Sequence, residues 1–331
     1  MNKPTIKNNS AILFLGGVIK NNMLPFRAAA FFIIMMAIFI IGRPDVFLSW
    51  RIYTAVFVSL PLIVFMTIPL VFIISSGEID LSFPSVFGMS AWAFAASVDV
   101  GLSPVIGLIA ALLTGIACGI INGLLVTKVG LSSLITTLGM NFLLRGIIHV
   151  GRGGHGITVT QLAGTPFRNG LVGRLGEFPI QMIWGLLFTF VGWWLYSRHR
   201  FGAHIRFVGD NQDSSREMGI RVEQVKTGAY VYVGIGAALA GVFSVLVLNT
   251  FFPTAGQGYL LPVLASVFIG GTPTWGGVGT IMGGFIGALV IAFVETGIIA
   301  IGFTGFWTQV FYGLAVILSL IMHRTYKHTR Y

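Results

Sequence analysis

The chain has 331 residues, of which 55% are hydrophobic and only 9% are charged, and its mean hydropathy is +0.90. Soluble domains carry about 25% charged residues, so this composition excludes most soluble enzyme folds and predicts a membrane protein. The net charge of +10 would elsewhere suggest nucleic acid as a partner. Here the cations lie in loops and tails beside apolar runs, which is typical of membrane proteins, so no nucleic-acid partner is expected.

Stretches that lack Lys, Arg, Asp and Glu mark the predicted membrane spans. A helix needs about 20 mostly apolar residues to cross the bilayer core. In chain order these stretches are residues 28–42, 52–77, 81–98, 100–127, 129–144, 178–197, 227–294 and 296–323. The seventh is too long for one helix and is interrupted at 250–258 and 270–277, so it predicts three segments, the middle one short. We therefore expect an all-α polytopic helical bundle of eight to ten spans, with ten as the preferred number and with some segments broken or short.

The distribution of basic residues predicts the topology. If both termini are cytoplasmic, ten segments place fourteen Lys and Arg inside and five outside, with Arg145 in a helix. The predicted domains are a cytoplasmic tail at 1–27, a membrane domain at 28–323 and a second cytoplasmic tail at 324–331. The apolar patch at 11–19 lacks a small-residue cleavage site, so we expect an uncleaved surface helix and not a signal peptide.

Two carboxylates lie between apolar segments in the stretch 75–85. Acidic groups near membrane depth are costly, which makes Glu78 and Asp80 functional candidates. The preferred interpretation is that Asp80, with Ser82 and Ser85, caps the next helix or forms a hinge. Direct contact with a solute is the alternative.

Glycines recur every four residues in two rows. This spacing leaves bare backbone on one helix face and favours close helix–helix packing within lipid. The rows are Gly115, Gly119 and Gly123, and Gly279, Gly283 and Gly287.

The long loop at 198–226 is predicted to be cytoplasmic. Asp210, Asn211 or Ser214 can cap a short helix in it, and Gly219 can end that helix. A charged, capped helix of two turns could dock in a groove of another protein, whereas a solvated connector is the bland alternative.

The stretch 269–283 contains glycines at the spacing of a phosphate loop. Gly277 and Val278 stand where that loop requires Lys and Ser or Thr, so we expect no ATP hydrolysis and no catalytic residue in this chain. Broken helices of this kind often line the cavities of transporters.

Polar side chains in or at the ends of spans are candidates for the translocation path, because amides and carboxylates bind hydroxyl-rich solutes. Each could equally form a helix–helix hydrogen bond. The histidines lack metal-ligand spacing, so no metal site is predicted. The predicted path residues are Glu78, Asp80, Ser82, Asn122, Asn141, Asn249, Thr272 and Glu295, and Arg145 is a further polar residue within a span.

The stretches 77–85, 209–220 and 269–283 together resemble the permease subunits of bacterial ABC importers for ribose, xylose, other simple sugars and autoinducer-2. The resemblance covers about residues 50 to 320. Two departures stand out, since Glu78 and Pro84 occupy positions that are glycine in the family pattern.

This resemblance implies a multi-pass permease in the bacterial inner membrane that imports a monosaccharide or similar small polyol. It implies a second permease copy, identical or sister, ATP-binding subunits that carry Mg-ATP, and a periplasmic sugar-binding protein, with no cofactor in this chain. The cytoplasmic stretch would be the coupling helix, with the residues Gly209, Asp210, Asn211, Ser214, Ser215, Arg216, Gly219 and Ile220.

Three other functions remain as alternatives. An ion-coupled secondary carrier would use Glu78, Asp80 and Glu295 as a relay. A membrane-embedded enzyme would need a catalytic set, such as Ser, His and Asp, that the sequence does not suggest. A non-transporting scaffold would tolerate substitution of Arg216 or Gly219.

Overall fold

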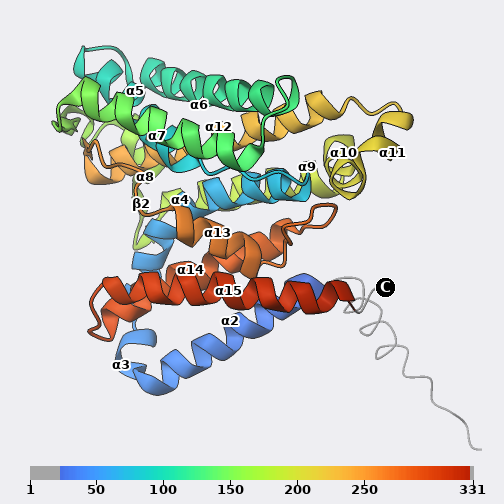
Figure 1. The fold of residues 1–331 in the computed structure, drawn as a ribbon. Coiled ribbons are helices and arrows are strands. Elements are labelled where there is room, and N and C mark those ends of the chain that lie inside the picture. Colours follow the sequence, from blue (N-terminus) through green and yellow to red (C-terminus); the bar gives the residue numbers. More distant parts are fainter. Residues whose placement is uncertain (1–22, 329–331) are drawn as a thin grey trace, which may run out of the picture.

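The computed structural model describes residues 23–328, which form a helical bundle (Figure 1). The predicted surface helix at 11–19 and the last three residues of the predicted C-terminal tail lie outside the described part. The helices are α2 (Met23–Gly42), α3 (Pro44–Phe47), α4 (Trp50–Ser75), α5 (Phe83–Asp99), α6 (Pro104–Thr127), α7 (Ser133–Arg152), α8 (Pro166–Val172), α9 (Ile180–Ser197), α10 (Arg200–Asp210), α11 (Gln212–Glu217), α12 (Val222–Leu248), α13 (Leu260–Ile269), α14 (Ile281–Ala300) and α15 (Phe306–His328).

Each of the ten predicted segments corresponds to one of these helices, namely α2, α4, α5, α6, α7, α9, α12, α13, α14 and α15. Within the described residues, six of them are long and apolar enough to cross a membrane: α4, α6, α7, α9, α12 and α14. The apolar parts of α2, α13 and α15 are shorter, and α5 has 17 residues. The all-α polytopic fold is therefore confirmed, with short segments where the sequence is interrupted.

Helix α4 forms the centre of the bundle. It packs against α12, α14, α9 and α13, and its residues from 60 to 75 are all buried. Two prolines, Pro61 and Pro69, lie inside it. A proline lacks the backbone N–H that a helix would use at that position. A glycine of a neighbouring helix faces each of them: Gly185 of α9 contacts Pro61, and Gly236 of α12 lies against the carbonyl of Phe65 and the ring of Pro69.

The first glycine row lies where α6 crosses α12. A side chain at Gly115 would collide with the backbone of Gly234, and one at Gly119 with the backbone of Tyr230. A Cβ at Gly123 would lie 2.8 Å from Thr227 Cα. The bare face of α6 therefore lets the backbones of α6 and α12 approach each other closely.

The second glycine row is divided between two contacts. Gly283 and Gly287 lie on α14 against the backbone of α13, at Gly270 and Ser266. Gly279 lies before Thr280, the N-cap residue of α14, and packs against the Ser75 side chain. The expectation that Gly279 continues the same helix face is thus wrong, because the helix begins two residues later.

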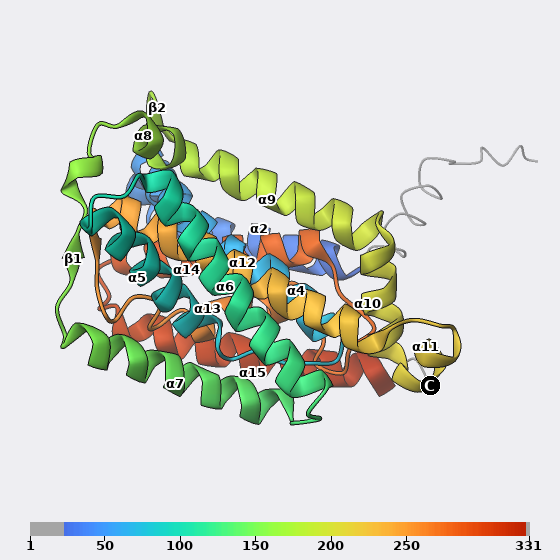
Figure 2. The same ribbon diagram turned by 90° about the horizontal axis from the view of Figure 1, so that it is seen from above.

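The two ends of the bundle differ (Figures 1 and 2). One end carries α10 and α11, and we call it the α10–α11 end. The other carries α8 and two short antiparallel pairs, β1 (Ile157–Thr158) with β4 (Thr250–Phe251) and β2 (Arg174–Leu175) with β3 (Phe178–Pro179), and we call it the β1–β4 end. Helix α2 begins and α15 ends on the same side as α10 and α11 (Figure 1).

Candidate functional site

The three sequence stretches 75–85, 209–220 and 269–283 meet at the α10–α11 end. Gly209, near the end of α10, lies so close to the Ser75 carbonyl and to Gly277 that a side chain there would overlap both. The same Ser75 carbonyl accepts a hydrogen bond from the backbone N–H of Gly277, at 2.8 Å. The end of α4, the end of α10 and the loop before α14 therefore share one tightly packed junction, which we call the glycine junction.

Side chains reinforce the glycine junction. Ser75 Oγ donates to the carbonyl of Val278 at 3.1 Å and accepts from the hydroxyl of Tyr196 at 2.9 Å. Tyr196 belongs to α9 and is buried. The junction thus ties α4, α9, α10 and the loop before α14 into one unit, because a serine can both donate and accept.

Helix α11 is a capped, largely exposed turn beside this junction. Asn211 is its N-cap, and Asn211 Oδ1 accepts from the backbone N–H of Ser214 at 3.0 Å. Gly219, with φ of +78°, follows the helix and lets Ile220 N–H reach the carbonyl of Ser215 at 3.0 Å. Of the three predicted cap candidates, Asn211 is the one that caps.

The surface of α11 combines charge with one exposed apolar side chain. Asp210, Arg216 and the other residues from 210 to 219 are exposed, apart from Ser215, which is buried. Met218, directly after the helix, is 61% exposed. A large apolar side chain framed by charged ones is the arrangement expected of a helix that inserts into a groove on a partner.

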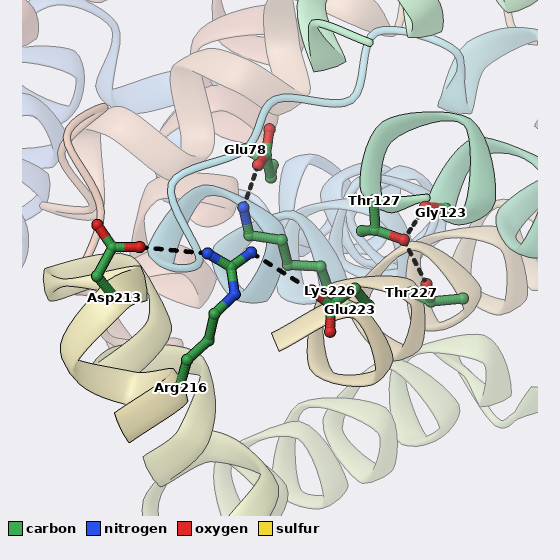
Figure 3. Close-up of polar contacts among 8 residues, drawn as sticks. All are labelled: Glu78, Gly123, Thr127, Asp213, Arg216, Glu223, Lys226 and Thr227. Atoms are coloured by element: carbon green, nitrogen blue, oxygen red, sulfur yellow. Dashed lines mark hydrogen bonds and ion pairs between the residues drawn. The ribbon is translucent and has the colours of Figure 1, made fainter. Parts of the chain in front are cut away.

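Two sets of ion pairs connect α11 with the interior (Figure 3). Arg216 of α11 contacts Asp213 at 3.2 Å and Glu223, in the first turn of α12, at 3.3 Å. One turn further along α12, Lys226 Nζ lies 2.5 Å from Glu78 Oε1. The first pairs are exposed or partly exposed, whereas the second is buried.

A chain of buried polar groups follows Glu78. Asp80 Oδ1 accepts from both the backbone N–H and the hydroxyl of Ser82, each at 2.7 Å. The side-chain amide of Asn122, on α6, donates to Ser82 Oγ at 2.8 Å. Its oxygen Oδ1 finds no partner among the described residues. Asp80 thus accepts a backbone N–H at the start of α5, in keeping with the capping interpretation. Ser82 is the N-cap residue of α5 but makes no side-chain cap bond, because its hydroxyl contacts Asp80 and Asn122.

Helix α7 holds the start of α5 through two residues one turn apart. Ser85 Oγ donates to the carbonyl of Asn141 at 2.8 Å and also contacts its side-chain oxygen. Arg145 donates to the carbonyls of Pro253 at 3.1 Å and Ala255 at 2.8 Å through Nη1, and to that of Pro84 at 3.3 Å through Nη2. One guanidinium thereby joins the loop between α12 and α13 to the first turn of α5.

The other predicted path residues lie elsewhere. Asn249 ends α12 with φ of +54°, and its carbonyl accepts from Val159 N–H at 2.8 Å. Thr272 is buried after α13, and Glu295 Oε2 accepts from Tyr312 at 3.1 Å. Asp80, Ser82 and Asn122 therefore form one cluster. Asn141 is linked to the same helix start through Ser85 of α5. Asn249, Thr272 and Glu295 are not part of this cluster.

Among the side chains that the structure describes, no group of three or more His, Cys, Asp or Glu could hold a metal ion.

Sequence reasoning did not find the roles of three residues. Lys226 was visible only as one basic residue of the loop, although a lysine at the start of an apolar helix needs a counter-ion. Arg145 was recognised as polar, but its three carbonyl partners are 61 to 110 residues away. No sequence pattern around Tyr196 indicates its hydrogen bond to Ser75, which lies 121 residues away.

Comparison with known proteins gives a consistent picture. Residues 52–320 match the family described as branched-chain amino acid transport system / permease component. The chain is 30% identical over 269 residues to the ribose import permease of Escherichia coli K12, covering 78% of this chain and 80% of that one. It is 31% identical over 301 residues to the D-allose transport system permease of the same strain, covering 90% and 91%.

The chain is also similar to two further permeases. The chain is 33% identical over 256 residues to the ribose import permease of Bacillus subtilis 168, covering 76% of this chain and 78% of that one. It is 28% identical over 285 residues to an autoinducer 2 import permease of an Enterobacter strain, covering 80% and 85%. No solved structure matches the chain. With its all-α membrane fold, the chain belongs to the permease components of ABC importers for sugars and related solutes, and it is a transport subunit and not an enzyme.

Proposed function

We propose that this chain forms the translocation path for a monosaccharide or similar small polyol delivered by a periplasmic binding protein. In this proposal ATP is hydrolysed, as Mg-ATP, on separate subunits. The names of the relatives, which include ribose, D-allose and autoinducer 2, support a small hydroxylated solute.

The observation that carries the proposal is the position of α11. It is capped by Asn211, exposes Met218, and adjoins the glycine junction, where Gly209 packs on Ser75 of the central helix. A partner that moves α11 would therefore move the end of α4 with it, because a close-packed junction is hardly compressible and transmits strain. We assign Gly209, Asp210, Asn211, Ser214, Ser215, Arg216, Gly219 and Ile220 to this coupling element.

We place the α10–α11 end in the cytoplasm. The loop from 198 to 226 carries six of the twenty Lys and Arg residues, and α2 begins and α15 ends at the same end (Figure 1). Basic residues concentrate on the cytoplasmic side of membrane proteins. The bacterial inner membrane, with both termini cytoplasmic, fits this arrangement.

A second permease copy is part of the proposal. Helices α6, α7 and α15 expose large apolar side chains, such as Ile135 at 72% and Leu318 at 58%. These faces offer surface for a second permease as well as for lipid. In this proposal the buried cluster of Asp80, Ser82 and Asn122 lies beside the translocation path and becomes accessible to the solute during transport.

The contacts of the acidic residues favour this function over an ion-coupled carrier. Glu78 pairs with Lys226, Asp80 with Ser82, and Glu295 with Tyr312. A proton relay would need these carboxylates to share partners in one chain. In the described structure each of these carboxylates has a different partner, which fits a positioning role better than a relay.

Charge substitution at two equally exposed apolar residues tests the proposal. Met218, beside α11, is 61% exposed, and Leu175, at the β1–β4 end, is 62% exposed. With a tag on the full chain in its native host, we expect an ATP-binding subunit to co-purify with the wild type and Leu175→Glu but not with Met218→Glu. Retention of the subunit by Met218→Glu, or its absence from the wild-type preparation, would contradict the proposal.

A further inference from the structure

The ion pair of Lys226 and Glu78 is largely shielded from solvent. Their side chains are only 6% and 14% exposed, and the two atoms are 2.5 Å apart. Removing two charges from water costs free energy, so a buried pair contributes little net stability. Removing one partner, however, leaves an uncompensated charge, so such a pair fixes the relative position of the two segments that carry it.

The pair continues a line of contacts that begins on α11 (Figure 3). Arg216 of α11 reaches Glu223 on α12. Glu223 and Lys226 are three residues apart on that helix, which places them on the same face. Lys226 then reaches Glu78 in the segment between α4 and α5.

The segment that receives this contact is also held by α6 and α7. The backbone N–H of Leu81 donates to Thr137 Oγ1 at 2.9 Å, and that of Ile79 donates to Ser133 Oγ at 3.3 Å. Asp80 is bonded to Ser82, which accepts from Asn122. Residues 76–82 therefore contact α12 through Glu78, α7 through Ile79 and Leu81, and α6 through Ser82, and they lead directly into α5.

We propose that the Glu78–Lys226 ion pair is a positioning contact that transmits displacement of α11 and the start of α12 to residues 76–82 and so to α5. The inference rests on the proposed function, since it takes α11 as the element that an ATP-binding subunit moves. Glu78 acts through Lys226 in this role and does not need to touch the solute.

The test measures a distance within the purified complex in nanodiscs and requires no knowledge of the solute. Spin labels are placed at Leu102→Cys, after α5, and at Leu175→Cys, in β2, in a Cys118→Ala background. Leu102 and Leu175 are 47% and 62% exposed, and Cys118 is buried. The distance between the labels is compared without nucleotide and with ATP and vanadate. We expect an ATP-dependent change in the otherwise unmodified complex.

Variants of Glu78 and Lys226 then show whether the ATP-dependent change requires the ion pair between these two positions. Glu78→Gln should abolish the ATP-dependent change, and the exchanged pair E78K/K226E should restore it. The matched control is the exchange R43D/D45R, because that ion pair is 2.8 Å long but exposed, and it should leave the change intact. If Glu78→Gln fails to assemble, the exchanged pair still decides, because it keeps both charges.

The results distinguish this inference from the proposed function. Co-purification of the ATP-binding subunit tests the proposed function alone. If the subunit co-purifies but Glu78→Gln keeps the full ATP-dependent change, or the exchanged pair assembles without restoring it, the inference is overturned while the proposed function stands.

Discussion

Arg145 provides the most direct test of how the bundle is held together. Its guanidinium donates to the carbonyls of Pro84, Pro253 and Ala255, which belong to the start of α5 and to the loop between α12 and α13. Arg145→Met keeps much of the apolar stem but removes every donor. Three partly buried carbonyls then lose a charged partner.

The expected cost follows from the number and length of these bonds. A hydrogen bond to a charged group contributes about 1.5–3 kcal/mol. The three bonds share one side chain and are not independent, and the bond to Pro84 is long, at 3.3 Å. We therefore expect Arg145→Met to lower the free energy of unfolding by about 3 kcal/mol. In a chain of this size that corresponds to a fall in apparent melting temperature of about 5 °C.

The measurement is thermal unfolding of the purified chain in detergent, followed by tryptophan fluorescence at one fixed scan rate, since unfolding of such proteins is often irreversible. Chymotryptic cleavage beside Phe252, which is 49% exposed, reports release of the loop. Arg145→Lys should recover part of the loss, because an ammonium keeps the charge but cannot span three carbonyls. The exposed Arg51→Met serves as the matched control and should change stability by less than about 0.5 kcal/mol.

If Arg145→Met melts within 1 °C of the wild type while cleavage at the loop is unchanged, the three hydrogen bonds do not hold the loop to α5.

Three further predictions concern packing and the cap of α11. Gly209→Ala should destabilise the chain by about 1–3 kcal/mol and reduce co-purification of an ATP-binding subunit, because the new methyl group overlaps the carbonyl at the end of α4. Gly115→Ala should destabilise to a similar extent by separating α6 from α12, but it should leave co-purification unchanged. For both, Gly139→Ala on α7 is the control, since a Cβ there meets nothing within 4 Å. If all three variants have the same melting temperature, close packing at Gly209 and Gly115 does not explain their stability. Asn211→Ala should lower the free energy of unfolding by about 1 kcal/mol and reduce co-purification of the ATP-binding subunit. Asn211→Ser should recover both the stability and the co-purification. If the two variants retain the subunit equally, the cap plays no part in coupling.

Much of the fold could be predicted because lipid imposes a simple rule on sequence. A charged residue is costly inside the bilayer, so the positions of α4 and α6 follow closely from the places where Lys, Arg, Asp and Glu are missing. Helix α12 departs from this rule, because it begins at Val222 and includes Glu223 and Lys226 before the charge-free stretch. The cap of α11 was also predictable, because Asn211 and Gly219 act on residues within a few positions. In both cases the determining interactions are local.

The site was harder to predict because its partners are distant in sequence. Glu78 and Lys226 are separated by 148 residues, and the apolar stretches between them do not specify which helices will be neighbours. Asp80 and Ser82 have the composition of a helix cap, but the amide of Asn122 competes for the same hydroxyl. Only the packing of α6 beside the start of α5 decides between these outcomes.

The prolines of α4 have a mechanical consequence. Each leaves a backbone carbonyl one turn earlier without its usual donor, and each is met by a glycine, Gly185 or Gly236, that has no side chain to obstruct rotation. The central helix therefore has two weaker points in its backbone hydrogen bonding, at Pro61 and Pro69. We expect a tilt of the part after Pro69, which ends at the glycine junction, to bend the helix there before it moves the part before Pro61.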